Sequence, residues 1–315
     1  MKKKSMRKLI FKILTIIFIV LLILAILALI YLISKIYIIG DRIHKPLDRK
    51  HSELRNHNVN FKDKEPFTIA LFGIDSDSQR TQESLGQRSD SIMILSINEN
   101  KQKTQILSIP RDTKARIIGK RTEEKIAHAY AYGGPNMSVK SLENLMNVPI
   151  DHYATIDMDG LKEVINDLDG INVVSNDTFT VDGLKFRKGQ KTHVNGTEAM
   201  KFIRSRKEEG AGGDFGRQKR QQLILEAMSE KLKNISSLKH FDSIMTTIQK
   251  NVKTDLTVSE MNTIKNNYKD ANKDIEKKQL EGNGGIQNDG LYYFIPSQNS
   301  KEKNRDLIIN NLKTN

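Results

Sequence analysis

The sequence predicts a layered α/β domain that follows one N-terminal membrane helix. Residues 13–34 form an uncharged apolar run near the start of the 315-residue chain. From residue 66 onward, short apolar or alternating runs rich in Ile alternate with segments of helical spacing. Alternating strands and helices are typical of layered α/β or α+β domains, and the remaining length is enough for a full core.

The apolar run has the length of a membrane span. As a helix of ~1.5 Å per residue, ILTIIFIVLLILAILALIYLIS crosses the ~30 Å hydrocarbon core of a bilayer. Bulky residues such as Tyr31 and Tyr37 stand where a cleaved signal peptide would have small ones, so we expect the anchor to stay. Residues 1–12 are basic without an acid, which places them in the cytoplasm by the positive-inside rule. The alternative for residues 13–34 is a buried core helix.

The rest of the chain is interpreted as a stalk and one domain. Residues 40–65 are polar without a sustained apolar period, which favours a stalk over residues 35–65, and no long linker divides residues 66–315. Strands are predicted at 67–74, 91–98, 104–109 and 290–297. Helices are predicted at 124–132, 135–146, 157–168, 214–234, 237–250, 257–270 and 301–313, and a further helix that Asn195 or Thr197 can cap runs to about Arg206.

The net charge, the absence of cysteine and the missing motifs exclude several classes of protein. The chain has 51 Lys and Arg against 38 Asp and Glu, and the formal charge of +13 points to anionic partners. The absence of cysteine excludes disulfides, cysteine nucleophiles and thiolate zinc sites. Residues 214–216 read DFG, yet the other kinase motifs are missing, as are P-loop, HExxH and GxSxG motifs. The twelve-residue basic tail is too short for a folded DNA-binding module, so we predict no nucleic-acid partner.

Two aspartates are candidate metal ligands. Asp75 closes the predicted strand that ends FGID, and Asp90 opens the next strand in RSDSIM. Both carboxylates are thus expected at one edge of a sheet, where a hard cation such as Mg²⁺ could take them together with water and substrate phosphate. The alternative is that each is an ordinary turn or cap residue.

Arginines at the ends of predicted elements are candidate phosphate ligands. A guanidinium keeps its charge and offers a planar fork of donors, which suits a pyrophosphate. The alternative is a solvated basic surface. A glycine-rich stretch, 210–216, leads into a helix start, which is a favourable place to bind an anion, and Arg217 and Gln221 would share a helix face. The set comprises Arg88, Arg111, Arg121, Arg204, Arg206, Arg217 and Arg220.

Two residues are candidate general bases. Asp214 stands just before a predicted helix, where it could cap the helix or accept a proton from an incoming hydroxyl. His128, in KIAHAY, could also act as a base, although a lone histidine in an apolar helix is more often a core residue.

Several motifs together resemble the LytR-CpsA-Psr family. They occur in the order of that family, behind a short basic tail and one membrane helix, and the resemblance covers roughly residues 66–235. The motifs are FGIDSD (72–77), RSDSIMILSIN (88–98), LSIPRDT (107–113), EKIAHAYAYGGP (124–135), FIRSRK (202–207) and GDFGRQKRQQ (213–222).

The resemblance implies a phosphotransferase at the cell membrane, single-pass and type II, with an extracytoplasmic domain. Members of the family move glycopolymers such as wall teichoic acid or capsule from an undecaprenyl-pyrophosphate carrier to peptidoglycan, with Mg²⁺. The implied fold is an α/β/α sandwich around a central mixed sheet, with an apolar cavity for the polyprenyl chain. Ile126, Ala129 and the stripe from Leu223 to Leu232 could line that cavity or belong to the ordinary core.

The resemblance also implies roles for individual residues. Asp75 and Asp90 match the metal-binding aspartates, with Asp77 as an alternative ligand, and Asp214 is a plausible base. Arg204 and Arg206 are further implied in catalysis, where they would absorb charge on the leaving lipid phosphate. The implied pyrophosphate-binding residues are Arg88, Arg111, Arg121, Lys125, Arg204, Arg206, Arg217 and Gln221.

Two other functions stay open at this point. Some members of the family are called regulators or attenuators, and such a protein would bind the lipid-linked ligand without turnover. A lipid-pyrophosphate hydrolase would use the same site with water as the acceptor. The sequence does not separate these from the transferase, and it predicts neither the polymer nor an oligomeric state.

Overall fold

The computed structural model describes most of the chain. The described residues are Leu22, Ile26, Ile30, Tyr31 and the ranges 33–75, 87–233 and 241–313. The predicted tail 1–12, most of the predicted membrane helix 13–34 and the alternative ligand Asp77 lie outside them. No helix within the described ranges combines the length and the apolar character that crossing a membrane requires.

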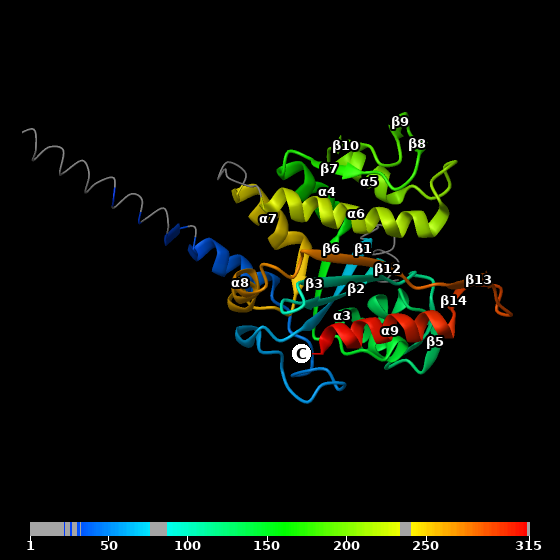
Figure 1. Ribbon diagram of the computed structural model, residues 1–315, viewed down its shortest axis with the longest axis horizontal. Helices are drawn as coiled ribbons and strands as arrows, with labels where there is room; N and C mark the ends of the chain where they lie inside the picture. Colours follow the sequence, from blue (N-terminus) through cyan, green and yellow to red (C-terminus); the bar gives the residue numbers. More distant parts are fainter. Residues whose placement is uncertain are drawn as a thin grey trace, which may run out of the picture.

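A mixed six-stranded sheet forms the centre of the molecule (Figure 1). Neighbours β1–β6 and β3–β12 are parallel, whereas β6–β11, β1–β2 and β2–β3 are antiparallel. This confirms the expected central mixed sheet. In spatial order the strands are β11 (Val252–Thr254), β6 (His152–Asp157), β1 (Phe67–Asp75), β2 (Arg88–Asn98), β3 (Lys103–Ser108) and β12 (Asp274–Gln279).

Helices cover both faces of this sheet (Figure 1). One face carries α4 (Met158–Asp167), α5 (Gly196–Arg204), α6 (Gly213–Lys233) and α7 (Phe241–Asn251). The opposite face carries α3 (His128–Met146) and α9 (Gln298–Leu312). The short helices η1 (Phe61–Asp63) and α8 (Val258–Asn267) pack on each other at one end. The α/β/α sandwich implied by the resemblance is therefore present.

Local sequence signals explain several helix boundaries. The Asn195 side chain accepts from the Glu198 amide and the Glu198 side chain accepts from the Asn195 amide, which forms a capping box at the predicted start of α5. Thr257 and Glu260 form the same box at α8. The prediction of a helix over 124–132 was wrong for its first residues, because Thr122–Lys125 is strand β5 and α3 begins only at His128.

The sequence analysis missed most of the short strands. Eight of them form four two-stranded ribbons outside the main sheet, of which only β14 had been predicted. The ribbons are β4 (Lys114–Ile117) with β5 (Thr122–Lys125), β7 (Ile171–Val174) with β10 (Lys191–Val194), β8 (Phe179–Val181) with β9 (Leu184–Phe186), and β13 (Gly282–Ile286) with β14 (Tyr292–Pro296).

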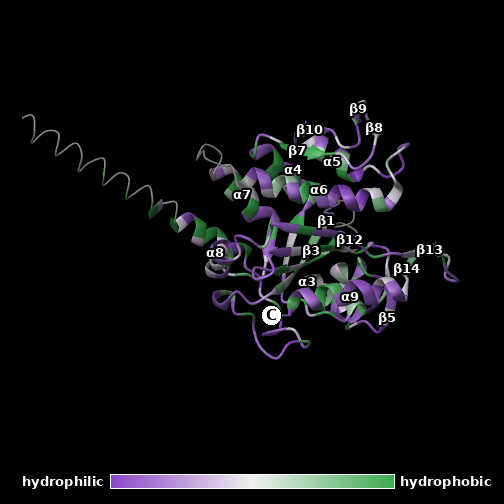
Figure 2. Cartoon of the chain, in the orientation of Figure 1, coloured by the Kyte–Doolittle hydropathy of each residue, from purple (hydrophilic) through white to green (hydrophobic). Residues whose placement is uncertain are grey.

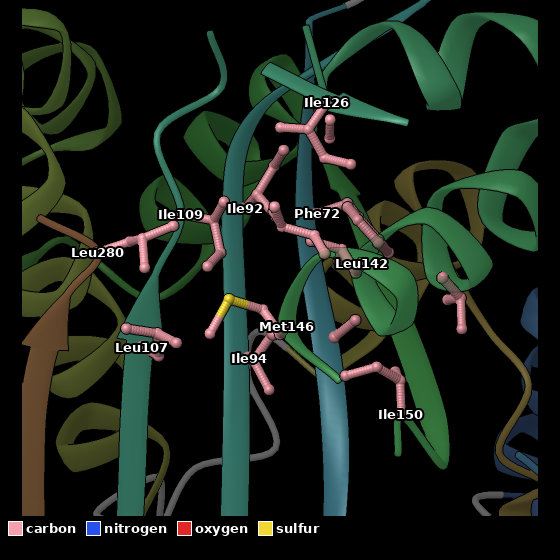
Figure 3. Packing of buried hydrophobic residues seen from close by; sticks show 14 of the residues in the cluster. Phe72, Ile92, Ile94, Leu107, Ile109, Ile126, Leu142, Met146, Ile150 and Leu280 are labelled. Atoms are coloured by element: carbon pink, nitrogen blue, oxygen red, sulfur yellow. The ribbon is translucent and has the colours of Figure 1, made fainter. Parts of the chain in front are cut away.

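Two apolar clusters lie on opposite faces of the sheet. Alternation along the strands directs Phe72 and Ile94 toward α3, where they join a cluster with Leu142 and Met146 (Figure 3). The second cluster lies among α4, α5, α6 and the ribbons beside them, and it includes Phe202. Hydrophobic residues gather between the layers, whereas the surface of α9 is mainly hydrophilic (Figure 2).

The segment predicted to be a stalk packs against the domain. The Arg49 guanidinium lies 2.5 Å from the Glu143 carboxylate on α3, and the hydroxyl of Tyr153 donates to the Lys45 carbonyl at 2.7 Å. The Phe61 ring is buried near Phe67. Polar contacts hold most of this segment, which explains why a search for apolar periodicity does not detect it.

Candidate active site

Three strand ends bring carboxylates to one edge of the sheet. Asp75, the last residue of β1, lies opposite Arg88 at the start of β2. The register between these strands shifts after Gly73, so that Asp90 is the extra residue of a β-bulge. Bulges redirect side chains and are frequent beside active sites. Asp157, at the end of the parallel strand β6, is the next carboxylate along this edge, and burial raises its pKa, with Asp75 adding to the effect.

A chain of ion pairs leads from Asp90 to the β4–β5 ribbon. The Arg111 guanidinium lies 2.8 Å from a carboxylate oxygen of Asp90 and 3.7 Å from one of Asp112. The Lys125 ammonium lies 2.8 Å from the other Asp112 oxygen. Although burial works against its charged form, the Asp90 carboxylate raises the pKa of Arg111. Asp112 thus links two predicted phosphate ligands, a role the sequence analysis missed although the residue lies in the quoted LSIPRDT motif.

The first turns of α6 add a second group of charges. The Arg217 guanidinium lies 2.5 Å from Asp214, whose other oxygen accepts from the Gln218 amide at 2.9 Å. Burial lowers the pKa of Arg217, and the nearby positive charges of Arg111 and Arg206 lower it further. The Nε atom of Arg217 is buried without a hydrogen-bond partner among the described residues. Several guanidinium groups this close together favour the binding of a multiply charged anion.

We call the set Asp90, Arg111, Lys125, Arg206, Asp214 and Arg217 the charged cluster. An apolar cavity of about 240 Å³ begins beside it, between the sheet and helices α4–α6. The Ser91 hydroxyl, next to Asp90, donates to Gln221 at 3.1 Å, and both side chains line the cavity. Gln221 follows Arg217 by about one helical turn.

One of the two helical segments predicted to line the cavity contributes residues to its wall. Ile224 and Met228 of the predicted stripe line the cavity, together with Leu225 and strand residues such as Leu71 and Met93. Ile126 lies instead in the cluster between the sheet and α3, on the other face. Of the two alternatives for Ile126, the ordinary core position is therefore confirmed. Ala129 is fully buried and does not line the cavity either.

A polar cleft of about 470 Å³ also borders the charged cluster. It is lined by Asp112, Arg206 and Asp214 together with the rings of Phe215 and Tyr292. Phe215 and Tyr292 are 39% and 48% exposed, and the Phe215 ring lies edge-on to the Phe294 ring with 6.2 Å between the ring centres. The charged cluster therefore has an apolar cavity beside it and a mixed polar and aromatic cleft along another edge.

Arg220 differs from the other arginines in the predicted set. Its side chain is fully buried and donates to the carbonyls of Ser205 and Ala211. The guanidinium stacks 4.8 Å from the centre of the Phe179 ring, and burial lowers the pKa of Arg220 to about 10. Arg220 holds the loop between α5 and α6, which carries Arg206, and is not available to a phosphate.

Three other candidates lie apart from these contacts. Arg121 is exposed in the β4–β5 turn, at the opposite end of the ribbon from Lys125. Arg204 is exposed at the last turn of α5, and no ion pair joins it to the charged cluster in the described part of the chain. His128 pairs with Glu124 at 3.0 Å, and no ion pair joins it to the charged cluster among the described residues.

Sequence comparison connects the chain with cell-wall enzymes. The profile of the LytR_cpsA_psr family matches residues 30–309. The chain is 40% identical over 257 residues to a protein of Bacillus anthracis named polyisoprenyl-teichoic acid–peptidoglycan teichoic acid transferase TagU. That match covers 81% of this chain and 82% of the relative.

Solved structures share the fold. The structure of TagT bound to LIIa-WTA superposes with a TM-score of 0.69 at 28% identity, covering 85% of this chain and 99% of TagT. A protein of Enterococcus faecalis described as a transcriptional regulator has the same TM-score at 32% identity, covering 81% of this chain and 90% of that one. From the family profile, the sequence relatives and the shared fold, we conclude that this chain belongs to the LytR-CpsA-Psr family.

Proposed function

We propose that this protein is a transferase that moves a teichoic-acid type glycopolymer from a polyisoprenyl-pyrophosphate carrier to peptidoglycan. The observation that carries the proposal is the charged cluster beside an apolar cavity. The uncharged cavity lined by Leu71, Met93 and Met228 is chemically suited to the apolar polyprenyl tail, and the cations beside it are suited to the attached pyrophosphate. The name of the B. anthracis relative describes the same reaction.

The charged residues supply what phosphoryl transfer requires. Such transfer depends on positioning and on stabilisation of developing charge more than on a covalent intermediate. Arg111, Arg206 and Arg217 would neutralise the lipid phosphate as it leaves, and Lys125 would add a further positive charge. Asp214 borders the cleft and would accept the proton of the acceptor hydroxyl, or polarise that hydroxyl. The product is a phosphodiester between polymer and peptidoglycan, with lipid monophosphate released.

Mg²⁺ is the proposed cofactor, held by Asp75 and Asp90. The donor set fits, because Mg²⁺ commonly takes one or two carboxylates and completes its shell with water and substrate phosphate. Both residues lie at one edge of the sheet, and the bulge at Asp90 breaks the regular register there. The ion would supply positive charge to the pyrophosphate. Asp77, outside the described residues, stays an alternative ligand.

The proposed location is the outer face of the cell membrane. The basic tail 1–12 and the apolar run 13–34 support a single-pass type II anchor. The structure adds that residues 45–61 are docked on the domain, so that little free chain would separate the domain from such an anchor. A lipid-linked donor in the same bilayer would then lie near the domain.

The test follows label from a lipid-pyrophosphate glycan to peptidoglycan, with the full chain in detergent, with and without Mg²⁺. We expect Mg²⁺-dependent label on peptidoglycan, lost in Arg206→Ala and retained in Arg116→Ala, whose arginine is exposed on β4. Unchanged turnover in Arg206→Ala would remove that arginine from the mechanism. Label released into water would identify a hydrolase, and tight binding without either product a regulator.

A further inference from the structure

A second polar groove, of about 500 Å³, lies between α6, β12 and α9. Four lysines line it, Lys219 from α6, Lys277 and Lys278 from β12, and Lys303 from α9, against one acidic side chain, Glu281. We call it the lysine groove. None of these residues belongs to the charged cluster, and the reaction proposed above assigns them no role.

The lysines differ in how they are paired. Lys277 forms an ion pair with Glu226, and Lys278 lies 2.9 Å from Glu276. Lys219 and Lys303 are exposed, and neither has an ion pair in the part of the chain that the structure describes. They lie on two different helices and line the same groove. This arrangement leaves two cations free to neutralise successive charges of a ligand that lies along it.

The other lining side chains are mainly amides. Asn176, Gln222 and Asn299 are among them, and Gln222 is fixed by its bonds to the Ser108 hydroxyl and the Lys278 carbonyl. No aromatic side chain lines the lysine groove as described, in contrast to the polar cleft with Phe215 and Tyr292. Sugar rings commonly stack on aromatic faces, whereas hydroxyls and phosphates need only donors and cations. The groove therefore suits a polyol-phosphate chain better than a glycan strand.

The lysine groove and the polar cleft lie on either side of the first turn of α6. The Gln279 amide, which lines the groove, donates to the carbonyl of Phe215 at 2.8 Å, and the Phe215 ring lines the cleft. Asn176 reaches Gly216 on the same turn. Both recesses thus meet at the first turn of α6, beside Asp214. A chain that leaves the charged cluster through the cleft would therefore need to cross only this turn of α6 to reach the groove.

We propose that the lysine groove binds the anionic polyol-phosphate chain of the donor polymer, beyond the sugars next to its pyrophosphate. This inference rests on the proposed function. Binding there would add affinity for long, charged polymers and would leave the chemical step unchanged. It would make the enzyme select donors by the number of phosphates in the chain.

The first test is binding of a soluble poly(glycerol phosphate) of about ten repeats, with uncharged dextran of similar length as the comparison. Reversing both free charges, in the double variant Lys219→Glu/Lys303→Glu of the full chain, should weaken binding of the phosphate polymer roughly ten-fold at low salt. Dextran binding should not change. The control is Lys185→Glu/Lys188→Glu, which reverses two exposed lysines in and beside strand β9, outside the groove.

The second test separates this inference from the proposed function. With a donor that carries the polymer, the Lys219→Glu/Lys303→Glu variant should show a raised KM and an unchanged kcat. With a donor that carries a single sugar, both constants should match the unchanged protein. Equal polymer binding in both proteins, or weaker binding of peptidoglycan glycan fragments alone, would overturn the groove assignment. Failure of every form to transfer even the single-sugar donor would overturn the proposed function, while the binding result would still decide the groove.

Discussion

The two faces of the central sheet are built from the same strands and differ in how completely they are filled. On the face toward α3, Phe72 and Ile94 lie in a dense cluster and are at most 1% exposed. On the face toward α6, the adjacent residues Leu71 and Met93 line the 240 Å³ cavity. Since side chains alternate along a strand, neighbouring positions serve opposite purposes. Both faces carry a buried apolar cluster, but only the face toward α6 also leaves a cavity, which close packing alone would not explain.

Arg217 should show the largest functional effect on the cavity side. Arg217→Ala removes a preorganised positive charge next to Asp214, and turnover should fall about 10²–10³-fold. Its matched control is Arg305→Ala on α9, on the filled side, where the ion pair of the arginine among the described residues is with its neighbour Asp306. Turnover is measured with the labelled donor, and unfolding in urea checks that both variants fold. A loss in Arg305→Ala equal to that in Arg217→Ala would contradict the division between the faces.

Large-to-small substitutions should separate the two faces by stability. Ile94→Ala opens a cavity in the filled cluster and should cost about 2–5 kcal/mol of unfolding free energy. Leu71→Ala enlarges a cavity that already exists, so that its cost should be only about 1 kcal/mol. Urea denaturation of both variants measures the difference. Equal costs would mean that the cavity is filled by rearranged side chains in solution.

Small-to-large substitutions should lower stability on the filled face and change donor binding on the cavity face. Ala70→Leu adds bulk to a fully buried site in the filled cluster and should cost about 1–3 kcal/mol. Ala154→Leu projects into the cavity and should leave stability within about 0.5 kcal/mol. It should nevertheless raise KM for a donor with a long polyprenyl tail more than for one with a short tail. The same KM change for both tails would show that the tail lies elsewhere.

The smallest effect concerns pH and the edge strand β12. Hydrogen bonds from Lys103 and Lys278 lower the pKa of Glu276 to about 2. Because the folded pKa lies below the unfolded value of about 4.3, the stabilisation is present above that value and is lost as pH falls toward 2. Glu276→Gln should therefore be slightly less stable at pH 7 and lose less stability between pH 5 and 2. If the free energy of unfolding changed with pH in the same way in both proteins, Glu276 would not contribute to the pH dependence of stability.

Local patterns predicted the parts of the fold whose boundaries are encoded nearby. The apolar runs FTIALFGI and SIMILSIN identified β1 and β2, and a cap at Asn195 or Thr197 was predicted to start α5, which the structure places at Asn195. Strand β12, with the sequence DIEKKQ, was missed because a charged edge strand has no apolar face to detect. Its pairing with β3 is a contact distant in sequence.

The site was predicted in its residue types and only in part in its arrangement. The family resemblance named Asp90, Arg111 and Arg217, which the structure places in one charged cluster. The sequence alone could not tell that Arg217 lies at the site whereas Arg220, three positions later on the same helix, does not. One lies at the site and the other is fully buried, a difference set by packing against Phe179 from a distant ribbon.

The buried Arg220 orders the loop that carries Arg206 before the donor binds. By donating to Ser205 and Ala211 it fastens both ends of the segment that carries Arg206. Ordering a backbone residue costs roughly 1–2 kcal/mol in conformational entropy. That entropy is lost when the chain folds and not when the donor arrives, so the segment needs no induced ordering on binding. The donor should thus meet an already ordered binding site. Its association rate should be limited by diffusion and should fall as the ionic strength rises.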